Sequence, residues 1–180
     1  MYNNRMHQLA EAIVLNATKE KIKIALVESC TGGMLGACIT SIPGSSGVFE
    51  FGYVAYSNNA KREMLGIPDQ TIQRFGVVSD VMAIHMASQA LLYSRADIAL
   101  SVTGVAGPTP GDLKKPVGLV YIGYGFIDNV FVAQHFFEGD RTSIRAEACE
   151  VSLNIILKML EQKQLDIMRR STAYANKKRW

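Results

Sequence analysis

Two serines and a lysine carry side chains that could support nucleophilic catalysis. Ser45 and Ser46 lie between Gly44 and Gly47, in a loop where a hydroxyl group is open to a substrate. A serine hydroxyl is a weak nucleophile that needs a base, and the glycine-rich loops contain no histidine. Lys61 could be that base. Catalytic Ser-Lys pairs have no fixed separation in sequence. The spacing alone therefore favours a serine in a turn and an exposed lysine over a catalytic pair.

A lysine acts as a base only in its neutral form. The usual lysine pKa is about 10.4, so catalysis near neutral pH needs a fall of roughly 3 units. Burial and the positive end of a helix both lower the pKa of an amine. Ser57 is a suitable N-cap for a helix that places Lys61 about one turn inside it, and Tyr56, just before the cap, could relay a proton.

A glycine-rich turn earlier in the chain is a candidate anion site. The segment 28–33 reads Glu-Ser-Cys-Thr-Gly-Gly between an apolar strand and a helix, where backbone N–H groups can face an anion. It matches neither the dinucleotide fingerprint nor the P-loop. Thr31, Gly32 and Gly33 suit a single phosphate, although the two glycines fit close packing of helix on strand equally well.

The elements that position these residues follow from hydrophobic periodicity and turn residues. We expect helices at residues 4–19, 34–39, 58–65, 69–75 and 80–94 and from 141 onward, and strands at 21–27, 48–56, 97–102, 117–126 and 130–137. This order predicts an α/β protein, a three-layer α/β/α sandwich with a mixed sheet. Ligands bind such sheets at the carboxyl ends of strands, which places 29–33, 56–61 and 103–107 on one rim.

Composition limits the class of protein. The chain has 180 residues, 48% hydrophobic and 19% charged, which indicates one folded domain and excludes a disordered protein. No apolar run is long enough for a transmembrane helix, and the N-terminus does not resemble a signal peptide. We therefore expect a cytoplasmic protein with no membrane partner. Three cysteines and three histidines lie far apart, so we expect no metal site and no cofactor.

Charge divides the chain into a body and a tail. The net charge is +3, and the excess of basic residues lies at the C-terminal end. We expect a domain at residues 1–162 and a flexible basic tail at 163–180. The near-neutral body does not predict a nucleic-acid partner, although Tyr174 and Trp180 in the tail could stack on bases.

Six motifs in order carry a family resemblance. They are Glu28-Ser29-Cys30-Thr31-Gly32-Gly33, Pro43-Gly44-Ser45-Ser46, Tyr56-Ser57-Asn58 with Lys61, Gly76-Val77-Val78-Ser79, Thr103-Gly104-Val105-Ala106-Gly107-Pro108 and Lys115-Pro116-Val117-Gly118. Together they closely resemble the CinA C-terminal domain family over residues 5–160. Active members of that family are nicotinamide mononucleotide (NMN) deamidases. The chain looks like the stand-alone form, since it has no room for the additional N-terminal domain of longer CinA proteins.

The resemblance also implies roles for residues. It implies Ser46 as nucleophile, with Lys61 and Tyr56 as its catalytic partners, hydrolysis of the NMN carboxamide without a metal, and self-association. Ser45 or Ser29 would be the next nucleophile to test. We expect backbone N–H groups of a glycine-rich loop to hold the oxyanion. The expected substrate-binding residues are Ser29, Thr31, Gly32, Gly33 and Ser45 on one side and Thr103, Gly104 and Gly107 on the opposite wall.

Some features leave other functions open. The segment 109–114 reads Thr-Pro-Gly-Asp-Leu-Lys and departs from the acidic and glycine-rich loop of active members. One alternative is therefore an inactive relative that binds a pyridine nucleotide as a regulatory protein. Others are an amidase for a different small amide and a DNA-associated protein. Arg141 and Arg145 could reach a phosphate, but we expect surface pairing with Glu138 or Glu147.

Overall fold

The computed structural model describes residues 3–110 and 114–177, with side chains described to residue 163. A single five-stranded sheet runs through its middle in the order β2-β1-β3-β4-β5. The first three strands are parallel, and the last two are antiparallel to their neighbours. The strands are β1 (Ile24–Glu28), β2 (Phe49–Val54), β3 (Ile98–Gly104), β4 (Leu119–Phe126) and β5 (Asn129–Phe136).

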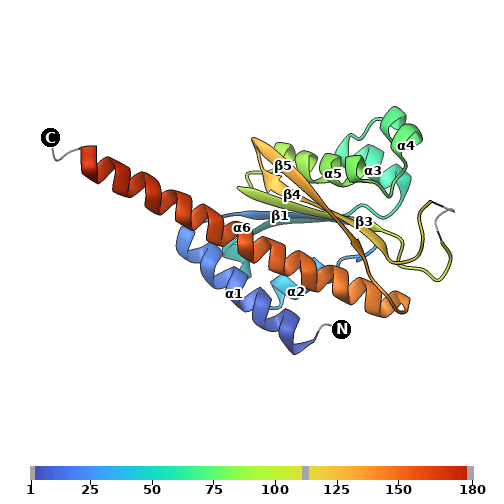
Figure 1. The fold of residues 1–180 in the computed structure, drawn as a ribbon, viewed down its shortest axis with the longest axis horizontal. Helices are drawn as coiled ribbons and strands as arrows, with labels where there is room; N and C mark the ends of the chain where they lie inside the picture. Colours follow the sequence, from blue (N-terminus) through green and yellow to red (C-terminus); the bar gives the residue numbers. More distant parts are fainter. Residues whose placement is uncertain (1–2, 111–113, 178–180) are drawn as a thin grey trace.

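Helices cover both faces of this sheet (Figure 1). One layer contains α1 (Asn4–Glu20), α2 (Met34–Thr40) and α6 (Arg141–Lys177). The other contains α3 (Asn58–Leu65), α4 (Asp69–Phe75) and α5 (Asp80–Tyr93). The predicted three-layer α/β/α sandwich with a mixed sheet is confirmed.

The two helical layers explain why the inner strands are apolar throughout. Alternate residues of a strand point to opposite faces, and every residue of β1 is buried. Ile24 and Leu26 belong to the core under α1, α2 and α6, whereas Ala25 and Val27 belong to the core under α3 and α5. A strand covered on both faces loses the alternation of polar and apolar residues.

Side-chain caps set the start of the helices that carry the candidate residues. The Ser57 hydroxyl accepts a hydrogen bond from the Ala60 N–H at 3.0 Å, and Gly66 ends the same helix in the left-handed conformation. Ser79 caps α5 in the same way, through the Met82 N–H at 3.1 Å. An N-cap of this kind contributes about 1 kcal/mol. Both predicted caps are confirmed.

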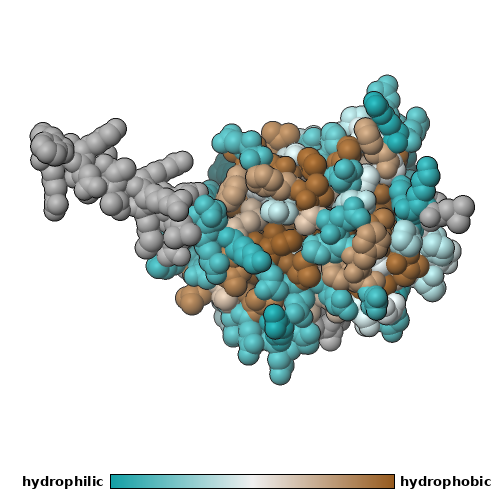
Figure 2. Space-filling view, viewed as in Figure 1, coloured by the Kyte–Doolittle hydropathy of each residue, from teal (hydrophilic) through white to brown (hydrophobic). Residues whose placement is uncertain are grey.

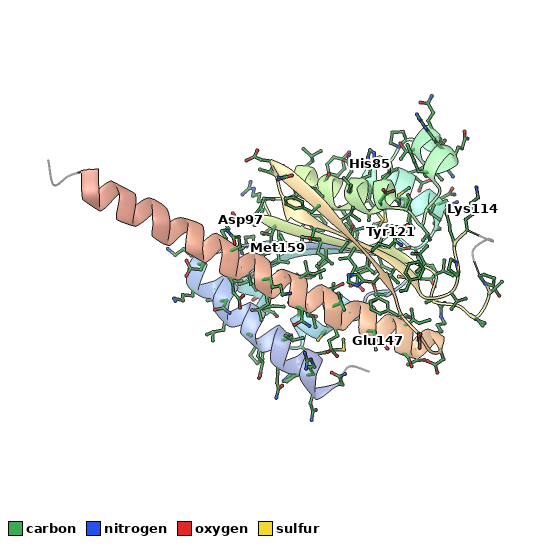
Figure 3. All side chains as sticks on the ribbon, in the orientation of Figure 1. His85, Asp97, Lys114, Tyr121, Glu147 and Met159 are labelled. Atoms are coloured by element: carbon green, nitrogen blue, oxygen red, sulfur yellow. The ribbon has the colours of Figure 1, made fainter. Side chains whose placement is uncertain are left out.

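The last helix continues beyond the predicted end of the domain at residue 162. The backbone of α6 stays helical to Lys177 and extends away from the rest of the protein (Figure 1). Lys163, the first residue of the basic segment, lies 3.0 Å from the Asp97 carboxylate, which Figure 3 labels. Flexibility of residues 163–180 stays a prediction, and Trp180 lies outside the described residues.

An apolar groove of about 610 Å³ lies between the β4–β5 edge and α6. Figure 2 shows hydrophobic side chains gathered on the face that contains α6. The lining includes Phe131 from β5 and Met159 from α6, the latter labelled in Figure 3.

Within the described ranges, every helix is too short or too polar to span a bilayer. In the same ranges, His, Cys, Asp and Glu side chains form no group that could hold a metal ion.

Candidate active site

The candidate residues gather at the carboxyl ends of the three parallel strands. The turn 29–33 follows β1, the segment 55–61 follows β2, and the loop that begins at residue 105 follows β3. The start of α6 lies at the same end of the molecule as Lys114 (Figure 3). This is the rim that the predicted topology indicates.

Lys61 is the buried centre of this rim. Its side chain is only 1% exposed. Its Nζ lies 3.0 Å from Ser29 Oγ, 2.7 Å from the Ala55 carbonyl oxygen and 3.4 Å from the Tyr56 carbonyl oxygen. Among the described residues, no carboxylate forms an ion pair with Lys61. Burial therefore lowers the pKa of Lys61 to about 8.

These three contacts fit an ammonium group that donates to all three oxygens, and they also fit a neutral amine. A neutral amine has two N–H donors and one lone pair, whereas an ammonium group has three donors and no lone pair. The carbonyls of Ala55 and Tyr56 can accept the two N–H groups. The lone pair is then left for the hydroxyl proton of Ser29. The surroundings of Lys61 thus suit a general base that is aimed at Ser29.

Ser46 does not come near Lys61. It lies in the short 3-10 helix Ser45–Gly47, directly before β2, whereas Lys61 follows β2. A strand of six residues therefore separates them, or roughly 20 Å at about 3.3 Å per residue. Ser46 is exposed, and the buried Ser45 lies in the same turn. The sequence contained one signal for Ser29 instead, since Ser29 follows a strand and Ser46 precedes one.

Tyr56 contacts the site through its backbone more than its hydroxyl group. Its carbonyl oxygen faces Lys61. Its phenol oxygen instead accepts a hydrogen bond from Arg141 at 2.6 Å, and the side chain is 55% exposed. Within the described part of the chain, the phenol therefore forms no hydrogen bond with Ser29 or Lys61 that could relay a proton.

The Glu28 carboxylate binds the backbone N–H groups at which the sequence predicts a phosphate site. This buried carboxylate accepts hydrogen bonds from the N–H groups of Gly33, Leu35 and Gly36, at 2.9, 3.1 and 2.7 Å. The Gly32 N–H donates to the Ser29 carbonyl oxygen at 3.0 Å. Gly32 and Gly33 both have positive φ angles, 62° and 90°, which glycine adopts without strain. These glycines therefore build the turn that presents Ser29.

Replacing Glu28 with glutamine is expected to destabilise the fold. The glutamine amide would turn an NH2 group toward N–H donors that now share two carboxylate oxygens. We expect the free energy of unfolding to fall by about 2–3 kcal/mol, measured by urea denaturation. The exposed Glu63→Gln is the matched control, and equal stability of the two variants would contradict this role.

The residues predicted to line the opposite wall make contacts within the protein, and their binding of substrate stays a prediction. The Thr103 hydroxyl donates to the Val77 carbonyl oxygen at 2.6 Å, and the residue is buried. A Cβ on Gly104 would lie 2.7 Å from the Leu119 carbonyl oxygen. Gly107 has a φ of 78°, and its carbonyl oxygen accepts from Arg141 at 2.9 Å. These residues shape and hold the loop after β3.

Arg145 ties the last helix to the turn that carries Ser29. Its Nε donates to the Cys30 carbonyl oxygen at 3.1 Å, and its guanidinium also donates to the Thr31 carbonyl oxygen at 2.7 Å. The expected pairing with Glu138 or Glu147 is wrong, because the guanidinium faces backbone carbonyls.

Burial raises the pKa of the Cys30 thiol to about 11, so this cysteine stays protonated and is a poor nucleophile.

The fold and site define an α/β protein with a buried serine–lysine pair at the carboxyl edge of a mixed sheet. The profile of the CinA C-terminal domain family matches residues 6–160, and the chain belongs to this family. A crystal structure of the competence/damage inducible protein CihA from Agrobacterium tumefaciens superposes with a TM-score of 0.84. The two sequences are 38% identical, and the match covers 89% of this chain and 98% of the CihA chain.

Two relatives differ in length. A nicotinamide-nucleotide amidohydrolase PncC from Enterobacter agglomerans is 40% identical over 88% of this chain and 97% of its own length. A putative competence-damage inducible protein from Caldicellulosiruptor bescii is 46% identical over 85% of this chain. The chain spans only 38% of the length of that longer relative.

Gly111, Asp112 and Leu113, which belong to the segment that departs from the loop of active family members, lie outside the described residues.

Proposed function

We propose that this protein is a nicotinamide-nucleotide amidohydrolase, which converts NMN and water to nicotinic acid mononucleotide and ammonia. The observation that carries the proposal is the buried Lys61 amine 3.0 Å from Ser29 Oγ. The amidohydrolase name of a relative that matches almost end to end supports the same reaction. We also propose that the protein acts in the cytoplasm as a homo-oligomer.

The first half of the proposed reaction forms an acyl-enzyme. Neutral Lys61 takes the hydroxyl proton of Ser29 as Oγ attacks the carboxamide carbon, and the carbonyl electron pair moves to oxygen. When this tetrahedral intermediate collapses, the C–N bond breaks. Lys61 gives its proton to the departing nitrogen, so that ammonia leaves and an ester to Ser29 remains.

The second half of the reaction repeats the same proton movements with water. Lys61 accepts a proton from the water molecule that attacks the ester carbon. The bond to Ser29 Oγ then breaks, and the proton returns to Oγ, which releases the carboxylic acid. The carbonyls of Ala55 and Tyr56 hold the amine in position during both halves.

The direct test is ammonia release from NMN by the purified protein. We expect one ammonia for each nicotinic acid mononucleotide formed, measured by a coupled ammonia assay and by chromatography of the nucleotides. No release, together with a higher melting temperature in NMN, would instead indicate a binding protein. Release from other small amides but not from NMN would indicate a different amidase.

A further inference from the structure

Arg141 carries a positive charge that the described protein does not neutralise. Its guanidinium donates to the Tyr56 hydroxyl at 2.6 Å and to the Gly107 carbonyl oxygen at 2.9 Å, both of which are uncharged acceptors. No carboxylate of the described residues forms an ion pair with it. Glu147, the partner expected from sequence, is exposed on α6 (Figure 3).

The position of Arg141 relates it to the reaction centre. Arg141 is the first residue of α6, and it bridges the segment after β2 and the loop after β3. Tyr56 has its carbonyl oxygen against Lys61 and its phenol oxygen against Arg141. The guanidinium is therefore joined to the lysine by a single tyrosine residue, on the exposed side of the site.

We propose that Arg141 binds the phosphate of the substrate and selects a nucleotide over the corresponding nucleoside. This inference rests on the proposed function, since it names the group that recognises one end of the same substrate. A guanidinium has five N–H donors in a planar fork that matches phosphate oxygens. Two donors are used by Tyr56 and Gly107, which leaves three for an anion.

Arg145 has a different role. It is half-buried, and its described bonds go to the carbonyls of Cys30 and Thr31. It therefore positions the turn of Ser29, while its charge adds to the positive potential around Arg141. Of these two arginines, Arg141 is the one whose exposed guanidinium is open to a dianionic phosphate.

The first experiment compares two substrates that differ only in the phosphate, NMN and nicotinamide riboside. We expect Arg141→Gln to raise KM for NMN by about 10- to 100-fold, as for the loss of a charge-assisted hydrogen bond, with a much smaller change in kcat. Activity on the riboside should change little. Arg141→Lys should restore part of the preference, and the exposed Lys158→Gln on the same helix is the control for charge alone.

A second measurement does not depend on turnover. In a Ser29→Ala background, isothermal titration calorimetry compares the Kd of NMN with the Kd of the riboside, with and without Arg141→Gln. We expect the preference for NMN to collapse when Arg141 is replaced. Inorganic phosphate should compete with NMN for the protein with Arg141 and not for the variant without it.

The outcomes separate the inference from the proposed function. If the wild type releases no ammonia but the calorimetric preference depends on Arg141, the deamidase proposal fails and the phosphate site stands. Equal losses for NMN and the riboside would overturn the phosphate site and leave Arg141 as a support for Tyr56. Tyr56→Phe would then reproduce those losses. Absence of any binding of NMN to Ser29→Ala would also overturn it.

Discussion

Replacing Ser29 with alanine is expected to reduce deamidation of NMN by about 10⁴-fold or more, as removal of a nucleophile does in other hydrolases. Ser29 Oγ is the serine oxygen in contact with Lys61 Nζ, at 3.0 Å. Without Oγ no acyl-enzyme can form. NMN should still bind, because the alanine removes only one buried oxygen atom. The measurements are kcat from ammonia release and Kd from calorimetry.

Ser46→Ala is the matched control for this prediction. Ser46 is exposed and lies at the other end of β2 from Lys61. A surface substitution of this kind usually changes stability by no more than about 0.5 kcal/mol, so we expect nearly normal activity. The reverse result, with Ser46→Ala inactive and Ser29→Ala active, would restore the nucleophile expected from the family resemblance.

Replacing Lys61 with methionine is expected to reduce turnover about as strongly as Ser29→Ala, because nucleophile and base act as a unit. In the wild type, kcat/KM should rise with pH and level off above about pH 8, the pKa to which burial lowers Lys61. The measurement is a pH–rate profile. Lys61→Arg keeps the charge but cannot be deprotonated at these pH values, so its recovery of activity would contradict a general base.

The same pKa predicts how stability depends on pH. The folded protein binds the Lys61 proton less tightly than the unfolded chain, with a pKa of about 8 against the usual 10.5. Between these values the unfolded chain holds more protons, so the free energy of unfolding rises with pH. The rise amounts to about 3 kcal/mol at 1.36 kcal/mol per pKa unit. Urea denaturation of Lys61→Met should lack this rise, and an unchanged rise would assign it to another group.

Much of the fold could be predicted from the sequence because its determinants are local. Helix caps such as Ser57 and Ser79 act within one turn, and both helices begin where these residues predict. The apolar run of β1 indicates a strand with both faces covered. The order of strands and helices then leaves few arrangements besides a three-layer sandwich. The rim that holds the site followed from that order.

The choice among residues on that rim depended on contacts between distant parts of the chain. Ser46 is nearer to Lys61 in sequence, but β2 lies between them and takes the chain from one end of the sheet to the other. Lys61 therefore contacts Ser29, which is more distant in sequence. Nor does the turn motif show that Glu28 itself binds the N–H groups that suggested a phosphate site.

Arg141 and Arg145 show the same limit. In sequence both have nearby carboxylates, whereas the packing of α6 turns them toward backbone carbonyls and the Tyr56 hydroxyl. The sequence by itself determined the elements, their layers and the edge of the sheet that carries the site, since caps and periodicity act over a few residues. Only the tertiary structure decided which side chains meet there, because hydrogen bonds and burial at that edge join residues from four separate segments, the turn after β1, the segment after β2, the loop after β3 and the start of α6.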